Sequence, residues 1–264
     1  MTDTTAEAPF VPANRRVFVL VAAILASAMG FIDGSVTSIA TPAIRNTLNA
    51  SLGDAQWVSN AYLLTLSHIG IVLVATLVSS VVAIGLAILV TRPVGEEFLP
   101  LSRTLANVGQ TFPPVAVLAL AVPVLGFGTA PTLVALFLYG LLPIFENALT
   151  GLTTVAPDVT ESARASGMTE TERLWQVDLP LALPLILAGV RLSVVISIGT
   201  ATIGSTVAAS TLGEAIIAGL INSNLAFIAQ GGVTVGILAI LAADLIGIAE
   251  RWALRRSGRA PVKA

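Results

Sequence analysis

Few side chains of this sequence offer acid–base, nucleophilic or metal chemistry. The chain has no cysteine and one histidine, His68, which excludes thiol catalysis, disulfides and Cys- or His-rich metal sites. No glycine-rich phosphate-binding loop with its lysine occurs, so we expect no cofactor, no metal and no enzymatic activity in this chain. The 13 basic and 15 acidic residues give a net charge of −2, which argues against a nucleic-acid-binding face.

The largest group of charged side chains in the interior of the sequence lies in the polar segment 151–179. Pro157 suits the first turn of a helix, where its missing N–H costs nothing. Gly167 is placed to end that helix. The segment has seven charged residues: Asp158, Glu161, Arg164, Glu170, Glu172, Arg173 and Asp178.

A second short helix is expected after the glycine. Thr169 and Glu172 have the spacing of a capping box, which marks a helix start. We expect Leu179 and Pro180 to end this helix and to open the next apolar stretch. The segment then presents a helix, a glycine bend and a helix, with apolar side chains available to enter a partner's groove: Val159, Ala163, Met168, Leu174 and Trp175.

Two long stretches of the chain contain no Asp, Glu, Lys or Arg: 36 residues from Gln56 to Thr91 and 42 from Thr104 to Phe145. Overall 55% of the residues are hydrophobic and 11% are charged, against about 25% charged in soluble domains. A bilayer-spanning helix needs about 20 apolar residues. We therefore predict an all-α, polytopic membrane helical bundle rather than a β-barrel.

Six membrane spans are expected, at residues 17–44, 69–90, 103–124, 130–151, 180–206 and 231–250. The stretch 56–91 would be about 54 Å long as one helix, against about 30 Å of hydrocarbon. Its first third is therefore expected to be an interfacial or broken piece that ends near His68. Pro123, Gly126 and Gly128 predict a tight hairpin between the third and fourth spans.

The two ends of the chain are polar. Residues 1–14 are expected to be disordered, and residues 253–264 form a basic tail. Arg15 and Arg16 before an apolar stretch also fit a signal peptide, although the apolar run continues past the possible cleavage point. If the spans alternate, eleven of the thirteen basic residues fall on one side. This asymmetry places both termini and the segment 151–179 in the cytoplasm.

Isolated polar residues inside the spans are candidates for a transport pathway or for helix packing. Arg191 lies about 16 Å into its helix, where a charge needs a partner or water, and Glu146 and Asp244 are candidate partners. A structural ion pair and a pathway role both remain open for it. Three further candidate pathway residues can bend helices or point polar groups inward: Gln110, Pro113 and Asn147. Asp33 and His68 are expected to be interfacial.

The polar segment carries a motif of seven positions: Glu161, Ser162, Ala163, Gly167, Val177, Leu179 and Pro180. It resembles the EAA loop of ABC importer permeases, E-A-A-x3-G-x9-I-x-L-P, with Ser for one Ala and Val for Ile. The resemblance implies that residues 156–178 are a coupling segment, held by a separate ATPase.

The resemblance extends over about residues 68–252 and implies the five-helix core of these permeases. Several segments resemble the osmoprotectant branch, whose members transport glycine betaine, carnitine or choline: Gln110–Pro114, Leu138–Ile144, Thr150–Leu152, Ala188–Arg191, Ile198–Thr202 and Leu212–Glu214. Three positions depart from the pattern. Ser210 and Thr211 stand where two glycines are usual, and Glu146 stands where a basic or neutral residue is expected.

Residues 15–67 resemble a different family. Phe31–Pro42 and Gln56–Leu64 are similar to the first helix and the start of the second in major-facilitator drug/proton antiporters. The chain thus resembles a fusion with a junction near Ser67 and His68, in which one extra N-terminal transmembrane helix precedes the permease core.

The resemblance implies a cell-membrane permease subunit of an ATP-driven osmoprotectant importer. Its partners would be cytoplasmic ATP-binding subunits, an external solute-binding protein, membrane lipid, and a second copy or a similar permease. With three Trp and two Tyr, no aromatic cage for a quaternary ammonium is expected in this chain, so affinity would lie in the binding protein. The alternatives are a proton-coupled multidrug antiporter fragment and a membrane protein that the fusion has made inactive.

Overall fold

The computed structural model describes residue 42 and residues 52–256, with side chains at 42 and 61–256. The chain divides into two units, Met1–Tyr62 and Leu63–Ala264, and the second carries the permease-like sequence. The described residues form helices and no strand, as expected for an all-α bundle. Apart from residue 42, the expected first span at 17–44 lies outside the described residues, as do Asp33 and the tail from 257.

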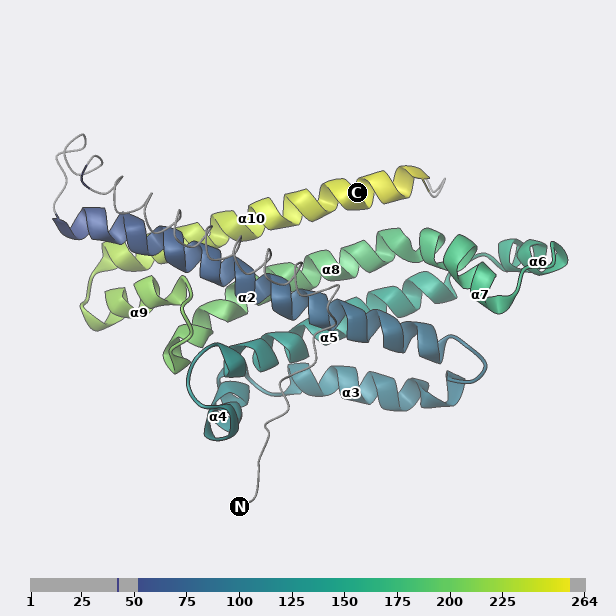
Figure 1. Ribbon diagram of the computed structural model, residues 1–264, viewed down its shortest axis with the longest axis horizontal. Helices are drawn as coiled ribbons and strands as arrows, with labels where there is room; N and C mark the ends of the chain where they lie inside the picture. Colours follow the sequence, from purple (N-terminus) through teal and green to yellow (C-terminus); the bar gives the residue numbers. More distant parts are fainter. Residues whose placement is uncertain (1–41, 43–51, 257–264) are drawn as a thin grey trace, which may run out of the picture. The chain divides into compact units, whose positions relative to one another are not determined.

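Figure 1 shows the order of the elements along the chain. They are α2 (Leu52–Val90), the 3-10 turn η1 (Glu96–Phe98), α3 (Leu99–Thr111), α4 (Pro114–Leu125), α5 (Thr129–Thr153), α6 (Pro157–Ala165), α7 (Glu170–Arg173), the π turn η2 (Leu174–Asp178), α8 (Leu179–Ala201), the 3-10 segment η3 (Thr202–Val207), α9 (Gly213–Ile221) and α10 (Leu225–Arg256). Among the described residues, four helical runs are long and apolar enough to cross a membrane, and the bent pair α3–α4 is a fifth if it counts as one span. Five core spans were expected.

The helix α2 is continuous over 39 residues. The piece before His68 is therefore not broken from the rest of the helix, which corrects that part of the expectation. The part from Ala61 to Val90 meets the length and composition of a span. A helix that exceeds the hydrocarbon thickness can tilt or extend beyond it, so length alone did not require a break.

The expected single span at 103–124 is instead bent by 96° between α3 and α4. Phe112 has an extended backbone at the break, with φ −91° and ψ 139°. The cause is local, because Pro113 disfavours a helical conformation at the residue before it. The expected hairpin follows α4, where Gly126 and Gly128 have positive φ angles of 77° and 119°.

The helix after Thr169 does not end at Leu179 and Pro180, which corrects the second boundary expected from the sequence. Helical structure runs without interruption from Glu170 to Val207 through the π turn η2. Pro180 lies in the first turn of α8, where its missing N–H is tolerated, and the wider π turn accommodates the chain before it. The short helix α7 is thus continuous with the membrane helix α8.

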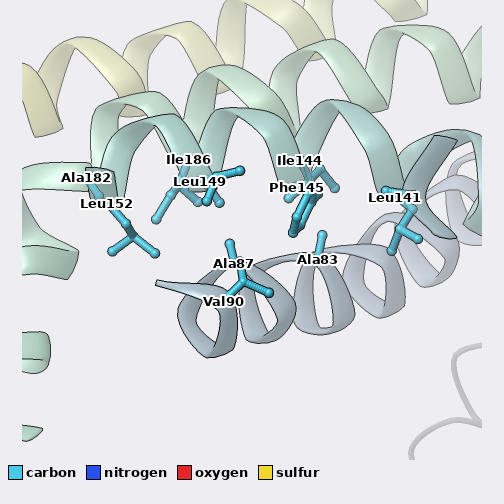
Figure 2. Close-up of a cluster of buried hydrophobic side chains, with 12 residues drawn as sticks. Ala83, Ala87, Val90, Leu141, Ile144, Phe145, Leu149, Leu152, Ala182 and Ile186 are labelled. Atoms are coloured by element: carbon cyan, nitrogen blue, oxygen red, sulfur yellow. The ribbon is translucent and has the colours of Figure 1, made fainter. Parts of the chain in front are cut away.

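The main core cluster is formed where α2, α5 and α8 meet. Figure 2 shows Ala83 and Ala87 of α2 facing Phe145 of α5. Phe145 is fully buried, as are both alanines, and Ala182 and Ile186 of α8 belong to the same cluster. Small side chains let helices approach closely, and such close packing is what holds helices together in lipid.

Candidate functional site

The helix α6 begins at Pro157 and ends in a glycine cap, as the sequence predicts. Gly167 has φ +81°, a left-handed conformation that favours glycine. Its N–H donates to the carbonyl of Arg164 at 2.9 Å, and the N–H of Met168 donates to the carbonyl of Ala163 at 3.2 Å. These two bonds form a Schellman motif, which reverses the chain after α6.

The predicted capping box is present at the start of α7. The N–H of Glu172 donates to Oγ1 of Thr169 at 3.2 Å, and the N–H of Thr169 donates to Oε2 of Glu172 at 2.8 Å. Both ends of the bend are therefore fixed by local hydrogen bonds. Figure 1 shows α6 and α7 together at the end of α8 that lies away from α9.

The seven motif positions differ in exposure. Glu161 and Ser162 are exposed on α6, and Pro180 is exposed on α8. Val177 and Leu179 are partly buried, and Leu179 packs against the main core cluster.

The apolar side chains expected to enter a partner's groove are only partly available. Ala163 is buried at 6% exposure and Leu174 packs against the core cluster, because both face the bundle. Trp175 is 66% exposed and Val159 is 39% exposed. The accessible surface of the segment therefore combines these two side chains with the polar face of α6.

An ion network holds the segment against the end of α2. Arg92, just after α2, places Nη2 2.7 Å from Oδ2 of Asp178 and Nη1 3.5 Å from Oε2 of Glu170. Arg173 reaches the same two carboxylates, at 3.4 Å for Asp178 and 2.7 Å for Glu170. Arg164 of α6 adds a contact of 3.4 Å with Glu170.

Sequence reasoning missed this network. Arg92 and Asp178 are separated by 86 residues in the sequence. Spacing along one helix could suggest the Glu170–Arg173 pair at i,i+3, but nothing in the sequence points from Arg92 to Asp178.

The four candidate pathway residues lie at three different helix contacts. Gln110 is exposed and its Nε2 donates to the carbonyl of Tyr139 at 3.4 Å, and Pro113 caps α4 nearby in sequence. Asn147 donates to the carbonyl of Pro143 in its own helix at 2.8 Å and lies where α5 meets Gly189 of α8. Arg191 lies between α8 and α10.

The partner of Arg191 is neither Glu146 nor Asp244, which corrects that expectation. Its Nη1 lies 3.5 Å from Oε2 of Glu250 on α10. Glu146 instead pairs with Arg103 of α3 at 3.3 Å. The reason is that α8 packs along α10, and the register of that contact brings Glu250 beside Arg191.

His68, which was expected to be interfacial, is fully buried inside the helical bundle. Its Nε2 lies 3.1 Å from the carbonyl oxygen of Ile198, and the N–H of Leu212 donates to its Nδ1 at 3.4 Å. An Nδ1 that accepts leaves the proton on Nε2, which then donates to Ile198. The ring thus connects α2 with α8 and with the residue that precedes α9.

Comparison with known proteins identifies the family. Residues 83–249 match the family model described as "Binding-protein-dependent transport system inner membrane component". This match covers more than half of the chain and contains the whole polar segment with its motif.

Curated relatives agree with this match. The choline transport system permease protein OpuBB of Bacillus subtilis is 39% identical over 187 residues, which are 71% of this chain and 85% of that protein. The osmoprotectant import permease protein OsmY of Salmonella typhimurium is 37% identical over 68% of this chain and 76% of its own length. The carnitine transport permease protein OpuCD of Listeria monocytogenes is 38% identical over 66% of this chain and 77% of its own length.

The fold also matches a solved transporter. An inward-facing structure of the MetNI methionine ABC transporter has a TM-score of 0.61 and 20% identity, covering 75% of this chain and 96% of that chain. At this identity the match shows the fold alone. With the family match and the apolar helices, it makes this chain a multi-pass membrane protein. The chain belongs to the family of binding-protein-dependent transport system inner membrane components, membrane permeases that work with a solute-binding protein and ATP-binding subunits.

Proposed function

We propose that this chain is the permease of an ATP-driven importer for quaternary ammonium osmoprotectants such as glycine betaine, choline or carnitine. The observation that carries the proposal is the identity of 37–39% to permeases named for choline, osmoprotectant and carnitine transport. The comparisons do not favour the antiporter alternative, and the sequence that suggested it lies mostly outside the described residues.

The geometry of the segment 156–178 supports coupling to an ATPase. Its helix α6 exposes Glu161 and Ser162, and the run from Glu170 to Val207 connects the bend to α8 without a break. Nucleotide-driven closure of two cytoplasmic ATPase subunits would displace α6 and switch the pathway between outward and inward access. The distribution of basic residues supports cytoplasmic termini and a cytoplasmic segment.

The aromatic residues support a separate binding protein as the source of affinity. Trp175 and Trp252 line one groove of about 570 Å³ with Arg256, and the Arg256 guanidinium covers the Trp252 ring at 3.9 Å. The hydroxyl of Tyr139 donates to the carbonyl of Phe112. Among the described side chains we therefore find no cage of several open aromatic faces, which a quaternary ammonium would need.

Uptake into vesicles tests the proposal. The full chain, as a homodimer or with a similar permease, would be reconstituted in lipid with its ATPase and binding protein, and labelled glycine betaine, choline and carnitine would be offered. We expect ATP-dependent uptake that stops when the ATPase is inactivated by mutation. Drug efflux that requires a proton gradient and no ATPase would support the antiporter instead, and absence of any transport would support an inactive fusion.

A further inference from the structure

The end of the first core helix is tied to the candidate coupling segment by a largely buried ion pair. Arg92 and Asp178 approach to 2.7 Å, and their side chains are 16% and 6% exposed. A buried charge that loses its partner is strongly destabilising. The ion pair, in addition to apolar packing, therefore holds this segment against the end of α2.

The surrounding charges make Arg92 the link between separate elements. Arg173 also reaches Asp178 and Glu170, but it belongs to the same continuous helical run as both carboxylates. Arg92 instead follows the end of α2, a separate element of the fold. Removing Arg173 would weaken a local network, whereas removing Arg92 would detach the network from α2.

Two atoms of the pair are buried and lack a hydrogen-bond partner among the described residues: Nε of Arg92 and Oδ1 of Asp178. Together with Nη2 and Oδ2, which already meet, they are the missing half of a side-on bidentate arginine–carboxylate pair. An unpaired buried polar group is costly. A bidentate arrangement of the two side chains would satisfy both atoms.

We propose that Arg92 is a positioning residue that makes α2 move together with the coupling segment, through the single hydrogen bond to Asp178 in this conformation and a bidentate one in another. The proposal rests on the proposed function in one respect, since the ATPase drives the movement. Displacement of α6 reaches α8 through the continuous helix. Arg92 transmits the same displacement to α2. The helix α2 in turn packs through Ala83 and Ala87 against Phe145 of α5.

Matched variants separate this role from general stability. Arg92→Ala removes the link, and Arg92→Lys keeps the charge but cannot form a bidentate pair. Arg103→Ala is the control, because it removes an arginine from an ion pair whose side chains are 51% and 38% exposed. Asp178→Asn, alone and with Arg92→Ala, completes a double-mutant cycle.

Two readouts are needed, in the full chain reconstituted with its ATPase and binding protein. The first is labelled choline taken up per ATP hydrolysed. The second is the mobility of a spin label at Ala165→Cys, an exposed position of α6 in a chain without native cysteine. We expect Arg92→Ala to lower uptake per ATP by about two- to thirty-fold and to raise label mobility, with Arg92→Lys intermediate, Arg103→Ala unchanged and the double variant no worse than Arg92→Ala.

Several outcomes would overturn the inference: unchanged uptake per ATP and mobility in Arg92→Ala, an equal loss in Arg103→Ala, or additive effects of Arg92→Ala and Asp178→Asn. If Arg92→Ala does not fold, Arg92→Lys decides by the same two readouts. If the unaltered chain transports no choline, the proposed function fails separately, and label mobility still shows whether Arg92 holds the segment.

Discussion

His68 and Ile198 are hydrogen-bonded across the bundle, with 3.1 Å between the ring Nε2 and the carbonyl oxygen and 130 residues between them in the sequence. The ring is fully buried. Because Nδ1 accepts from the N–H of Leu212, one side chain of α2 satisfies two backbone groups on other segments. His68 therefore fixes α2 against the region where α8 gives way to η3 and α9.

We expect His68→Leu to destabilise the permease, because it leaves the carbonyl of Ile198 and the N–H of Leu212 buried without a partner. Each such group costs about 1–3 kcal/mol. The measurement is the melting temperature of the purified protein in detergent. His68→Gln is the matched control, since an amide can both donate and accept, and it should lose less. A leucine variant with the same melting temperature as the unaltered protein would contradict this role.

The bend after α6 requires a glycine because of its backbone conformation and not because a side chain would clash. A Cβ built on Gly167 would meet no atom within 4 Å, yet φ is +81°. We expect Gly167→Val to reduce ATP-coupled uptake severely, because a left-handed conformation costs an L-residue about 1–2 kcal/mol. Gly167→Asn should retain most uptake, since asparagine tolerates this conformation. Equal uptake by the two variants would contradict the argument, with membrane insertion checked by expression.

Local signals made the polar segment predictable. Pro157, Gly167 and the Thr169–Glu172 capping box each act within a few residues, and the structure shows the helix, the bend and the second helix where they were expected. The continuation of the helix through Pro180 was not predictable, because a π turn before a proline leaves no sequence pattern that distinguishes it from a helix end.

Long-range partners were not predictable for a different reason. Glu146, Asp244 and Glu250 were all available to Arg191, and only the register between α8 and α10 selects Glu250. The sequence also contained no sign that α2 turns the ring of His68 into the bundle, where it is fully buried. The partner of a side chain depends on which helix faces lie in contact, and the sequence of one helix alone does not determine this.

The contact between α3 and α5 depends on a glycine. A Cβ at Gly109 would lie 2.3 Å from the backbone oxygen of Leu138, so one helix must move. We expect Gly109→Ala to lower the melting temperature markedly. Gly85→Ala is the matched control, because a Cβ there meets nothing within 4 Å and alanine favours a helix over glycine by about 0.5–1 kcal/mol. Equal melting of the two variants would show that α3 shifts freely on α5.

The Arg191–Glu250 pair offers a test of whether Arg191 serves packing or transport. The side chains are 42% and 23% exposed and 3.5 Å apart, so the pair itself contributes little, about 0–1 kcal/mol. A lone charge between membrane helices is costly, and we therefore expect Glu250→Gln to lower the melting temperature more than the double variant with Arg191→Gln.

Uptake by that double variant then decides the role of Arg191. The double variant has neither charge and is expected to recover stability. If Arg191 serves helix packing only, uptake by the double variant should be close to that of the unaltered protein. We expect this result, since the guanidinium lies against α10, where a Cβ on Gly247 would be 3.5 Å from its Cζ. A stable double variant that has lost uptake would instead place Arg191 in the transport pathway, and a double variant as unstable as Glu250→Gln would show that the pair is not the relevant contact.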